Sequence, residues 1–270
     1  MNKMKTVIIR QEEKADYPGS EAMVRRAFYN RQNPGCVEHY LLHILRESSD
    51  YLPAYSFLAE VEGRIVGAIY FSKAFIKTAK GDVPIVTFGP LAVDPLYQGL
   101  GIGRQLFEKS VSLLRKSPYP GIAIYGEPNY YPRLGFQRAK LFGITDPEGN
   151  VYDPLMVYEL RKDGFKGVQG QLFQSPIFEK GNEPKAVAAF DLLFPPYPKL
   201  KVPAQWLHET NLGQVEKIEG SLYQIRFWEI LIPAKLAEGY AARTPQVGDY
   251  ITFFCKRNAI SLIQTLEIPE

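Results

Sequence analysis

Cysteine is scarce in this chain of 270 residues, which contains only Cys36 and Cys255. The two lie far apart and show neither metal-binding nor redox spacing, so two reduced thiols in a cytosolic protein are the simplest account. Long apolar runs are also missing. The N-terminal MNKMKTVIIRQEEKAD turns charged before a signal core develops, and no later run approaches the length of a membrane span. We therefore expect a cytoplasmic protein with no membrane partner.

An excess of charge of either sign is absent as well. The net charge is +3, and the lysines and arginines are scattered among acidic residues rather than gathered into blocks. This distribution does not indicate nucleic-acid binding. Hydrophobic residues make up 46% of the chain and charged residues 23%, which is ordinary for a soluble globular protein. The length suits two modest domains.

The first part of the chain predicts helices followed by an antiparallel meander. Residues 6–9 are a short β-branched run, and Asp16 or Ser20 can cap a helix whose apolar positions continue to Phe28. A second helix is predicted near residues 37–48. Alternating apolar residues and glycine-containing turns then predict strands over residues 56–61, 64–76 and 83–93.

The most informative stretch is TFGPLAVDPLYQGLGIGR, residues 87–104. It predicts a buried strand, a turn at Asp94, and a loop in which Gly99, Gly101 and Gly103 alternate just before a helical pattern. The first N–H groups of a helix are unpaired and the helix dipole is positive there, so a phosphate or pyrophosphate binds well. Glycines let the anion approach the backbone, although an ordinary strand-to-helix turn is the alternative interpretation.

The spacing of these glycines excludes two nucleotide motifs. A dinucleotide fingerprint would need glycine at Arg104 or Leu106, and a P-loop would need Gly-Lys-Ser/Thr. What remains is Gln-Gly-Leu-Gly-Ile-Gly, residues 98–103, which matches a Gln/Arg-x-x-Gly-x-Gly/Ala signature. With LAVDP before it, the chain resembles the GNAT superfamily of acetyltransferases, which use acetyl coenzyme A.

A second segment carries the same resemblance. Strand-like GIAIY, residues 121–125, is followed by YPRLGF, residues 131–136, which matches the Tyr-x-Lys/Arg-x-Gly-Phe segment after the fifth strand of GNAT proteins. Both segments occur in the right order, and the resemblance covers about the first 160 residues. Residues 136–144 and 154–160 are then expected to supply closing strands.

The resemblance implies a fold and a coenzyme site. The fold is an α/β domain with a mixed, largely antiparallel sheet flanked by helices. The loop amides would hold the pyrophosphate of acetyl-CoA, and the backbones of Leu91 and Val93 would pair with its pantetheine arm. The residues implied for coenzyme binding are Leu91, Val93, Gln98, Gly99, Leu100, Gly101, Ile102, Gly103 and Arg104. No metal is expected.

Two residues are candidates for catalysis. Acetyl transfer to an amine needs a free-base nucleophile and a proton for the leaving thiolate. We expect Tyr131 to donate that proton. There are two alternatives: Tyr131 is only a packed aromatic residue, or the adjacent Tyr130 is the donor. The strand VPIVTFGPLAV contains no acid, so Glu127 is the leading candidate for the base, with Asp94 second and a water chain equally plausible.

Histidine offers no better alternative. His39 and His43 are four apart on the second predicted helix, as two metal ligands would be. No third ligand is apparent, and we expect solvent exposure or contact with the acetyl acceptor instead.

The remainder of the chain predicts a second, β-rich domain. We place the acetyltransferase domain at residues 1–180, a linker at 181–198 and a barrel-like domain at 199–270. Residues 166–173 and 186–194 are a possible strand and an apolar helix or strand. Strands are predicted at 215–218, 223–232, 250–255 and 260–268. We expect this second domain to serve in packing or oligomerisation, including a homodimer interface. The reason is that its aromatic residues suit a core or an interface: Trp206, Tyr223, Phe227 and Trp228.

Three functions are consistent with these features. The leading one is an N-acetyltransferase acting on a small-molecule or peptide amine by direct attack. The alternatives are a non-catalytic coenzyme A sensor whose C-terminal part binds RNA or protein, and an inert scaffold with an empty glycine loop.

Overall fold

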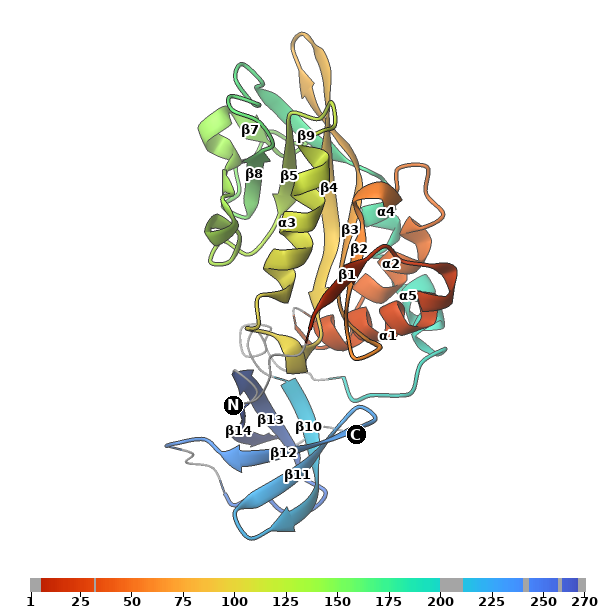
Figure 1. Ribbon diagram of the computed structural model, residues 1–270, viewed down its shortest axis with the longest axis vertical. Helices are drawn as coiled ribbons and strands as arrows, with labels where there is room; N and C mark the ends of the chain where they lie inside the picture. Colours follow the sequence, from red (N-terminus) through yellow and green to blue (C-terminus); the bar gives the residue numbers. More distant parts are fainter. Residues whose placement is uncertain (1–5, 32, 200–210, 240–242, 257–258, 267–270) are drawn as a thin grey trace.

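The computed structural model describes residues 6–31, 33–199, 211–239, 243–256 and 259–266. A nine-stranded sheet forms the larger part of the molecule, and a closed five-stranded barrel forms the smaller part (Figure 1). Helices cover the larger sheet, and the barrel adjoins one end of it. The predicted fold class, a mixed α/β sheet with a second β-rich part, is confirmed.

The larger sheet has the strand order β1-β2-β3-β4-β5-β8-β6, with β9 and β7 attached beside β3. Its strands are β1 (Ile8–Arg10), β2 (Phe57–Val61), β3 (Arg64–Thr78), β4 (Gly81–Val93), β5 (Gly121–Tyr125), β6 (Gln137–Arg138), β7 (Ile144–Thr145), β8 (Leu155–Glu159) and β9 (Gly170–Gln174). Along the main order, β4 and β5 run parallel and every other pair is antiparallel. Five predicted strands are confirmed with small shifts at their ends. They are the three strands of the meander, the strand GIAIY, and the closing strand at residues 154–160.

Strands β4 and β5 separate after one residue pair, Val86 with Ile122. On its other side β4 stays paired with β3, but it carries an extra residue there: Ile69 pairs with Leu91, and Phe71 pairs with Phe88. Gly89 and Pro90, which are joined by a cis peptide, form this bulge. Beyond Val86, β4 therefore has a partner strand on only one of its edges within the described chain.

Helices cover the sheet on both faces. They are α1 (Tyr17–Phe28), α2 (Glu38–Leu45), α3 (Ile102–Leu114), α4 (Ile177–Lys180) and α5 (Pro184–Asp191). Helix α3 buries Leu106 and Phe107 against one face, together with Phe88 and Phe136. Helices α1 and α2 bury a separate cluster that includes Tyr70 of β3 on the opposite face. Because side chains alternate between the two faces along β3 and β4, these strands contribute residues to two different hydrophobic cores.

Short 3-10 helices replace part of the predicted secondary structure. They are η1 (Lys14–Asp16), η2 (Pro53–Tyr55), η3 (Pro95–Tyr97), η4 (Tyr131–Leu134) and η5 (Ala139–Phe142). The strand predicted at 136–144 is wrong, because Gly143 adopts a positive φ of 68° and the chain coils as η5 between two short strands. Similarly, the second helix is shorter than predicted. Asp16 precedes α1 as expected, but its carboxylate accepts hydrogen bonds from Arg10 at 2.6 and 2.8 Å.

The barrel consists of strands β10 (Asn211–Glu219), β11 (Leu222–Phe227), β12 (Ile230–Leu236), β13 (Tyr250–Lys256) and β14 (Ala259–Leu266). Its core contains Val215, Ile225, Phe227 and Phe253. The single strand predicted over 223–232 is wrong, because Trp228 has a φ of 54° and turns the chain from β11 into β12. Tyr223 and Phe227 are buried in the core as predicted, whereas Trp206 lies outside the described residues.

Arg25 of α1 joins the two parts of the molecule. Its side chain is 2% exposed, and its Nε donates to Asp191 at 2.7 Å. The guanidinium also lies 4.8 Å from the ring centre of Trp228 in the barrel, and Trp228 stacks on Tyr197 with ring centres 3.9 Å apart. Because these contacts link α1, α5, the following segment and the barrel, one buried cation organises the junction. The boundary at 181–198 stays a prediction, and α5 lies within it.

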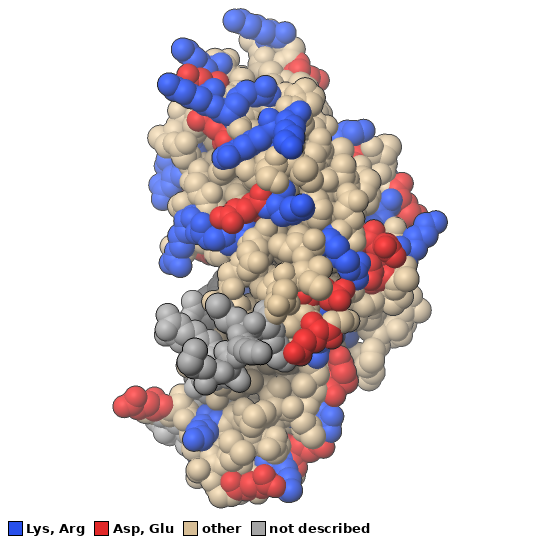
Figure 2. All heavy atoms as spheres, viewed as in Figure 1, with Lys and Arg blue, Asp and Glu red and all other residues tan. Residues whose placement is uncertain are grey.

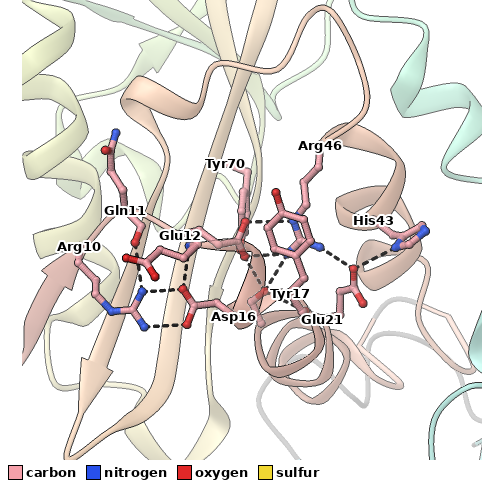
Figure 3. A network of polar contacts seen from close by, with 11 residues as sticks. Arg10, Gln11, Glu12, Asp16, Tyr17, Glu21, His43, Arg46 and Tyr70 are labelled. Atoms are coloured by element: carbon pink, nitrogen blue, oxygen red, sulfur yellow. Dashed lines mark hydrogen bonds and ion pairs between the residues drawn. The ribbon is translucent and has the colours of Figure 1, made fainter.

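A second buried ion network fixes α1 and α2 to the sheet (Figure 3). Arg46 donates to Glu12 at 2.7 Å, and Glu12 also accepts from the hydroxyls of Ser20 and Tyr70, each at 2.6 Å. Glu21 accepts a further bond from Arg46. These buried charges have hydrogen-bond partners, so the network ties the first helices to β3.

No helix in the described part of the chain is long and apolar enough to cross a membrane.

We predict that Arg25→Met lowers the free energy of unfolding by about 3 to 5 kcal/mol, because it removes a buried cation that donates to both Asp191 and the carbonyl of Pro195, and leaves Asp191 with the weaker contacts to His39 and Lys199. Arg226→Met removes an exposed ion pair with Glu216 in the barrel and should have little effect. Guanidinium denaturation followed by tryptophan fluorescence measures both variants. Equal stability of the two variants would contradict the role assigned to Arg25.

Candidate functional site

The glycine loop meets the N-terminus of α3, as the sequence predicts. Gly99 and Gly101 have φ angles of 76° and 79°, a left-handed conformation that glycine adopts without steric cost. Gly101 is the N-cap of α3, and the first helical bond runs from the N–H of Gln105 to its carbonyl. The N–H groups of the first turn, residues 102–104, are therefore available to an anion.

This loop lines a cavity of about 510 Å³, which we call the loop cavity. It is bounded by the end of β4, the loop and first turn of α3, and the segment from the end of β5 through η4. The predicted site residues that line it are Leu91, Val93, Gln98, Gly99, Gly101, Ile102, Gly103, Arg104, Glu127 and Tyr131. Leu100 is absent from the lining and its side chain is 41% exposed. Segments far apart in the sequence thus converge as the resemblance implies.

Tyr131 lies where the separated strands leave room on the α3 side of the sheet. Its ring packs against Phe88 and Phe136 with centre distances of 5.8 and 5.4 Å. A Cβ at Gly126 would come within 2.3 Å of this ring, so a glycine is needed there. Burial raises the pKa of the Tyr131 hydroxyl above its ordinary value, which keeps it protonated at neutral pH.

Three residues of the loop cavity were not candidates in the sequence: Tyr97, Arg133 and Leu134; Tyr130, the alternative to Tyr131, also lines it. Tyr130 crosses to α3, because its hydroxyl lies 2.8 Å from where a Cβ of Gly103 would be. Tyr130, Arg133 and Leu134 flank or belong to YPRLGF, and this adjacency was the available signal. Tyr97 follows the Asp94 turn, where no motif marked it.

The two carboxylates considered as bases occupy different environments. Glu127 is the sole acidic residue among the described residues lining the loop cavity, and its exposed carboxylate accepts from Asn129 at 3.1 Å. Asp94 is fully buried outside that lining, where it accepts from two nitrogens of Arg26, each at 3.1 Å. Asp94 is thus committed to an ion pair, whereas Glu127 borders the cavity.

The turn before the loop also contacts the barrel. Leu96 packs against the barrel core, and its carbonyl lies 3.9 Å from the thiol of Cys255. Arg26 extends the contact by donating to Glu229 at 3.3 Å. The next residue, Tyr97, lines the loop cavity. One short 3-10 helix therefore faces the barrel with one side chain and the cavity with the next.

The two histidines of α2 lie away from this cavity. His39 is fully buried beside Asp191, with 3.3 Å between its Nε2 and the carboxylate, so the expected solvent exposure is wrong for it. His43 is 46% exposed and lies 3.1 Å from Glu21. Within the described residues, no group of three or more His, Cys, Asp or Glu side chains is arranged to hold a metal ion.

Two arginines border the loop cavity. Arg104 and Arg133 belong to its lining, and Arg104 donates to the carbonyl of Arg133 at 2.9 Å. Figure 2 shows Lys and Arg side chains gathered over the part of the larger sheet that carries α3, β5 and β8. A phosphate-bearing ligand is attracted to such a surface.

Comparison with known proteins identifies relatives of the larger sheet region. A family model described as an acetyltransferase (GNAT) domain matches residues 53–138. The uncharacterized N-acetyltransferase YhbS of Escherichia coli is 30% identical over 164 residues, which are 61% of this chain and 93% of that protein. The uncharacterized N-acetyltransferase YjhQ of E. coli is 39% identical over 98 residues, which are 36% of this chain and 54% of that protein.

Solved structures agree with this similarity. The crystal structure of E. coli YhbS in complex with CoA superposes with a TM-score of 0.59 at 28% identity, covering 66% of this chain and 95% of that one. A GNAT family acetyltransferase from Brucella melitensis in complex with acetyl-CoA has the same fold, with a TM-score of 0.52 at 23% identity, covering 65% and 99% of the two chains.

Proposed function

We propose a reaction for this chain on the premise that it belongs to the GNAT family of N-acetyltransferases. The reaction is transfer of the acetyl group of acetyl-CoA to a primary amine by direct attack in a ternary complex. The observation that carries this proposal is the loop cavity, where the glycine loop, the unpaired edge of β4 and Tyr131 meet. A cytoplasmic location and a homodimer stay predictions.

The residues of the loop cavity fit coenzyme A. A side chain at Gly103 would occupy the space beside the first turn of α3, because its Cβ would lie 2.8 Å from the Tyr130 hydroxyl. The backbone N–H groups of residues 102–104 and the cations of Arg104 and Arg133 provide donors for the pyrophosphate. The YhbS structure, which contains CoA, supports this assignment.

The pantetheine arm fits the edge of β4. Leu91 and Val93 line the loop cavity beyond the last residue pair with β5, so their backbone groups can bind an amide-rich chain as another strand would. Their side chains pack toward the α3 core, which leaves the backbone as the binding element. An amide in this segment would also polarise the thioester carbonyl.

The chemistry then needs two proton transfers. The amine nitrogen forms a bond to the acetyl carbon, and the bond from that carbon to sulfur breaks. Tyr131 donates a proton to the leaving sulfur, and the proton lost by the amine passes to Glu127 or to water. An alkylamine has a pKa of about 10.4, so it must be deprotonated before attack. The products are the N-acetylated amine and the free coenzyme thiol.

Coenzyme binding is tested by thermal melting. Acetyl-CoA at about 100 times its dissociation constant should stabilise the protein by roughly 2.7 kcal/mol and raise Tm by several degrees. Gly103→Ala should weaken binding about tenfold, because its Cβ meets the Tyr130 hydroxyl. Adding Tyr130→Phe to that variant should restore most of the affinity.

Leu100→Ala is the matched control, because this loop side chain is exposed and lies outside the cavity lining. It should bind acetyl-CoA as the unchanged protein does. The absence of a melting shift in the unchanged protein at saturating coenzyme would refute the proposed coenzyme site.

Tyr131 is tested by the rate of thiol release from acetyl-CoA across a panel of primary amines. With the best amine, Tyr131→Phe should lower kcat about 100-fold while the coenzyme dissociation constant stays the same, because the proton donor is lost. Tyr130→Phe is the control for its neighbour and should retain most of kcat. Full turnover by Tyr131→Phe would remove Tyr131 from the mechanism, and a melting shift without turnover on any amine would favour a coenzyme sensor.

Glu127 is tested by the pH dependence of kcat/KM with the same amine. If Glu127 is the base, Glu127→Gln should lower kcat/KM and change its pH dependence. Asn129→Ala, which removes the amide that contacts Glu127, should leave the pH dependence of kcat/KM unchanged. An unchanged profile in Glu127→Gln would assign the proton transfer to water.

A further inference from the structure

The face of the sheet opposite α3 has a polar patch at the point where β4 and β5 separate. Thr87 and Gly89 lie on this face of β4, because the intervening Phe88 belongs to the core on the α3 side. Ser72 of β3 is directly opposite Thr87 in the antiparallel pairing. Ser72 and Thr87 are both fully buried. We call Ser72, Thr87 and Gly89 the Gly89 patch.

The acceptor needs access to this point from one of the two faces. On the α3 face, the rings of Phe88, Tyr131 and Phe136 pack on one another, and the loop cavity for the coenzyme lies beside them. That side is therefore occupied by protein and coenzyme. The Gly89 patch is on the other side of the same backbone, and Gly89 is the residue there that has no side chain to block an approach.

Phe178 of α4 covers the Gly89 patch. Its Cε1 lies 3.1 Å from the position that a Cβ of Gly89 would have, and the ring is only partly buried. The start of this segment is fixed by Ser175, whose hydroxyl donates to Asp50 at 2.7 Å. Phe178 therefore closes the approach to Gly89 from an anchored but short helix.

A buried hydroxyl lies beneath this cover. Ser72 Oγ has no hydrogen-bond partner among the described residues, although it is completely buried. Leaving such a group unpaired costs about 1 to 3 kcal/mol, so an unpaired hydroxyl at this position indicates a ligand partner. Its neighbour Thr87 is paired, because it accepts from the side chain of Gln174 at 2.8 Å.

We propose that the acceptor amine reaches the thioester over Gly89 and beneath Phe178, and that its N–H donates to Ser72 Oγ. This inference rests on the proposed function, since it needs acetyl-CoA on the opposite side of β4. The patch, Gln174 and Phe178 contain no ionisable side chain, and the titratable groups beside them are engaged: Tyr70 donates to Glu12, and Asp50 accepts from Ser175. The site therefore offers no free cation to a carboxylate next to the amine. Because Phe178 lies 3.1 Å from where a single Cβ on Gly89 would be, the acceptor class is an alkylamine unbranched at the carbon that bears nitrogen.

Three probe amines test this class: n-pentylamine, 2-aminopentane, which is branched at the amine carbon, and norleucine, which carries a carboxylate there. The unchanged protein should prefer n-pentylamine. Phe178→Ala should raise kcat/KM for 2-aminopentane relative to n-pentylamine at least tenfold by opening the approach. Ser72→Ala should lower kcat/KM for n-pentylamine about tenfold by removing the hydrogen-bond acceptor. Neither variant should change the dissociation constant of coenzyme A more than about twofold.

Hydrolysis of acetyl-CoA without added amine provides a readout that needs no known acceptor. Water forms the new bond to the acetyl carbon, acetate and the free thiol are released, and Phe178→Ala should accelerate this reaction several-fold by admitting water. Phe173→Ala is the matched control. Phe173 stacks on Phe75 at 5.2 Å and, next to Gln174 in β9, points to the other face.

Unchanged hydrolysis together with unchanged amine selectivity in Phe178→Ala would overturn the proposed approach. An equal effect of Phe173→Ala would also overturn it, because the change would then reflect general loosening. Loss of coenzyme binding in the unchanged protein would instead refute the proposed function, so the two failures are distinguishable.

Discussion

The separation of two parallel strands is the constraint on which this structure depends. Strands β4 and β5 share one residue pair, and β5 then continues along β8. The unpaired edge of β4 must be satisfied by something other than a strand, since buried backbone groups need hydrogen bonds. The loop cavity lies along this edge, and the N-terminus of α3 closes its end. A cavity along an unpaired strand edge is thus the consequence of a sheet that does not complete its own pairing.

The position of the barrel follows from the same region of the chain. The turn between β4 and the glycine loop buries Leu96 against the barrel core and presents Tyr97 to the loop cavity. Asp94, which begins this turn, is held by Arg26, and Arg26 also reaches Glu229 of the barrel. Arg25, the residue before Arg26 on α1, contacts Trp228 of the barrel. Two adjacent arginines of one helix therefore hold both the turn and the barrel. The barrel therefore forms part of the support of the loop.

The sequence predicted the features that local chemistry determines. The alternating glycines predict a loop that opens a helix, and Gly99 and Gly101 form such a loop at the N-terminus of α3. The mixed, largely antiparallel sheet flanked by helices followed from a family resemblance carried by short motifs. Contacts between distant segments were not predictable in this way: nothing in the local pattern relates Phe178 to Gly89, or Trp228 to Arg25. Trp228 was assigned to a strand because its neighbours are apolar, whereas its positive φ depends on tertiary contacts that override propensity.

Hydroxyl groups around the bulge in β4 show how the two sides of the sheet differ. Tyr70 faces the bulge, but its hydroxyl donates to Glu12 at 2.6 Å, and burial raises the pKa of this hydroxyl. Tyr70 is therefore committed to the network that fixes α1 and α2. Thr87 is likewise engaged with Gln174. Ser72 keeps a buried hydroxyl without a hydrogen-bond partner in the described chain, and Tyr131 packs on the opposite face of the sheet, where its hydroxyl borders the loop cavity. The proposed reaction, in which the two substrates approach from opposite sides, would use one of these hydroxyls on each side.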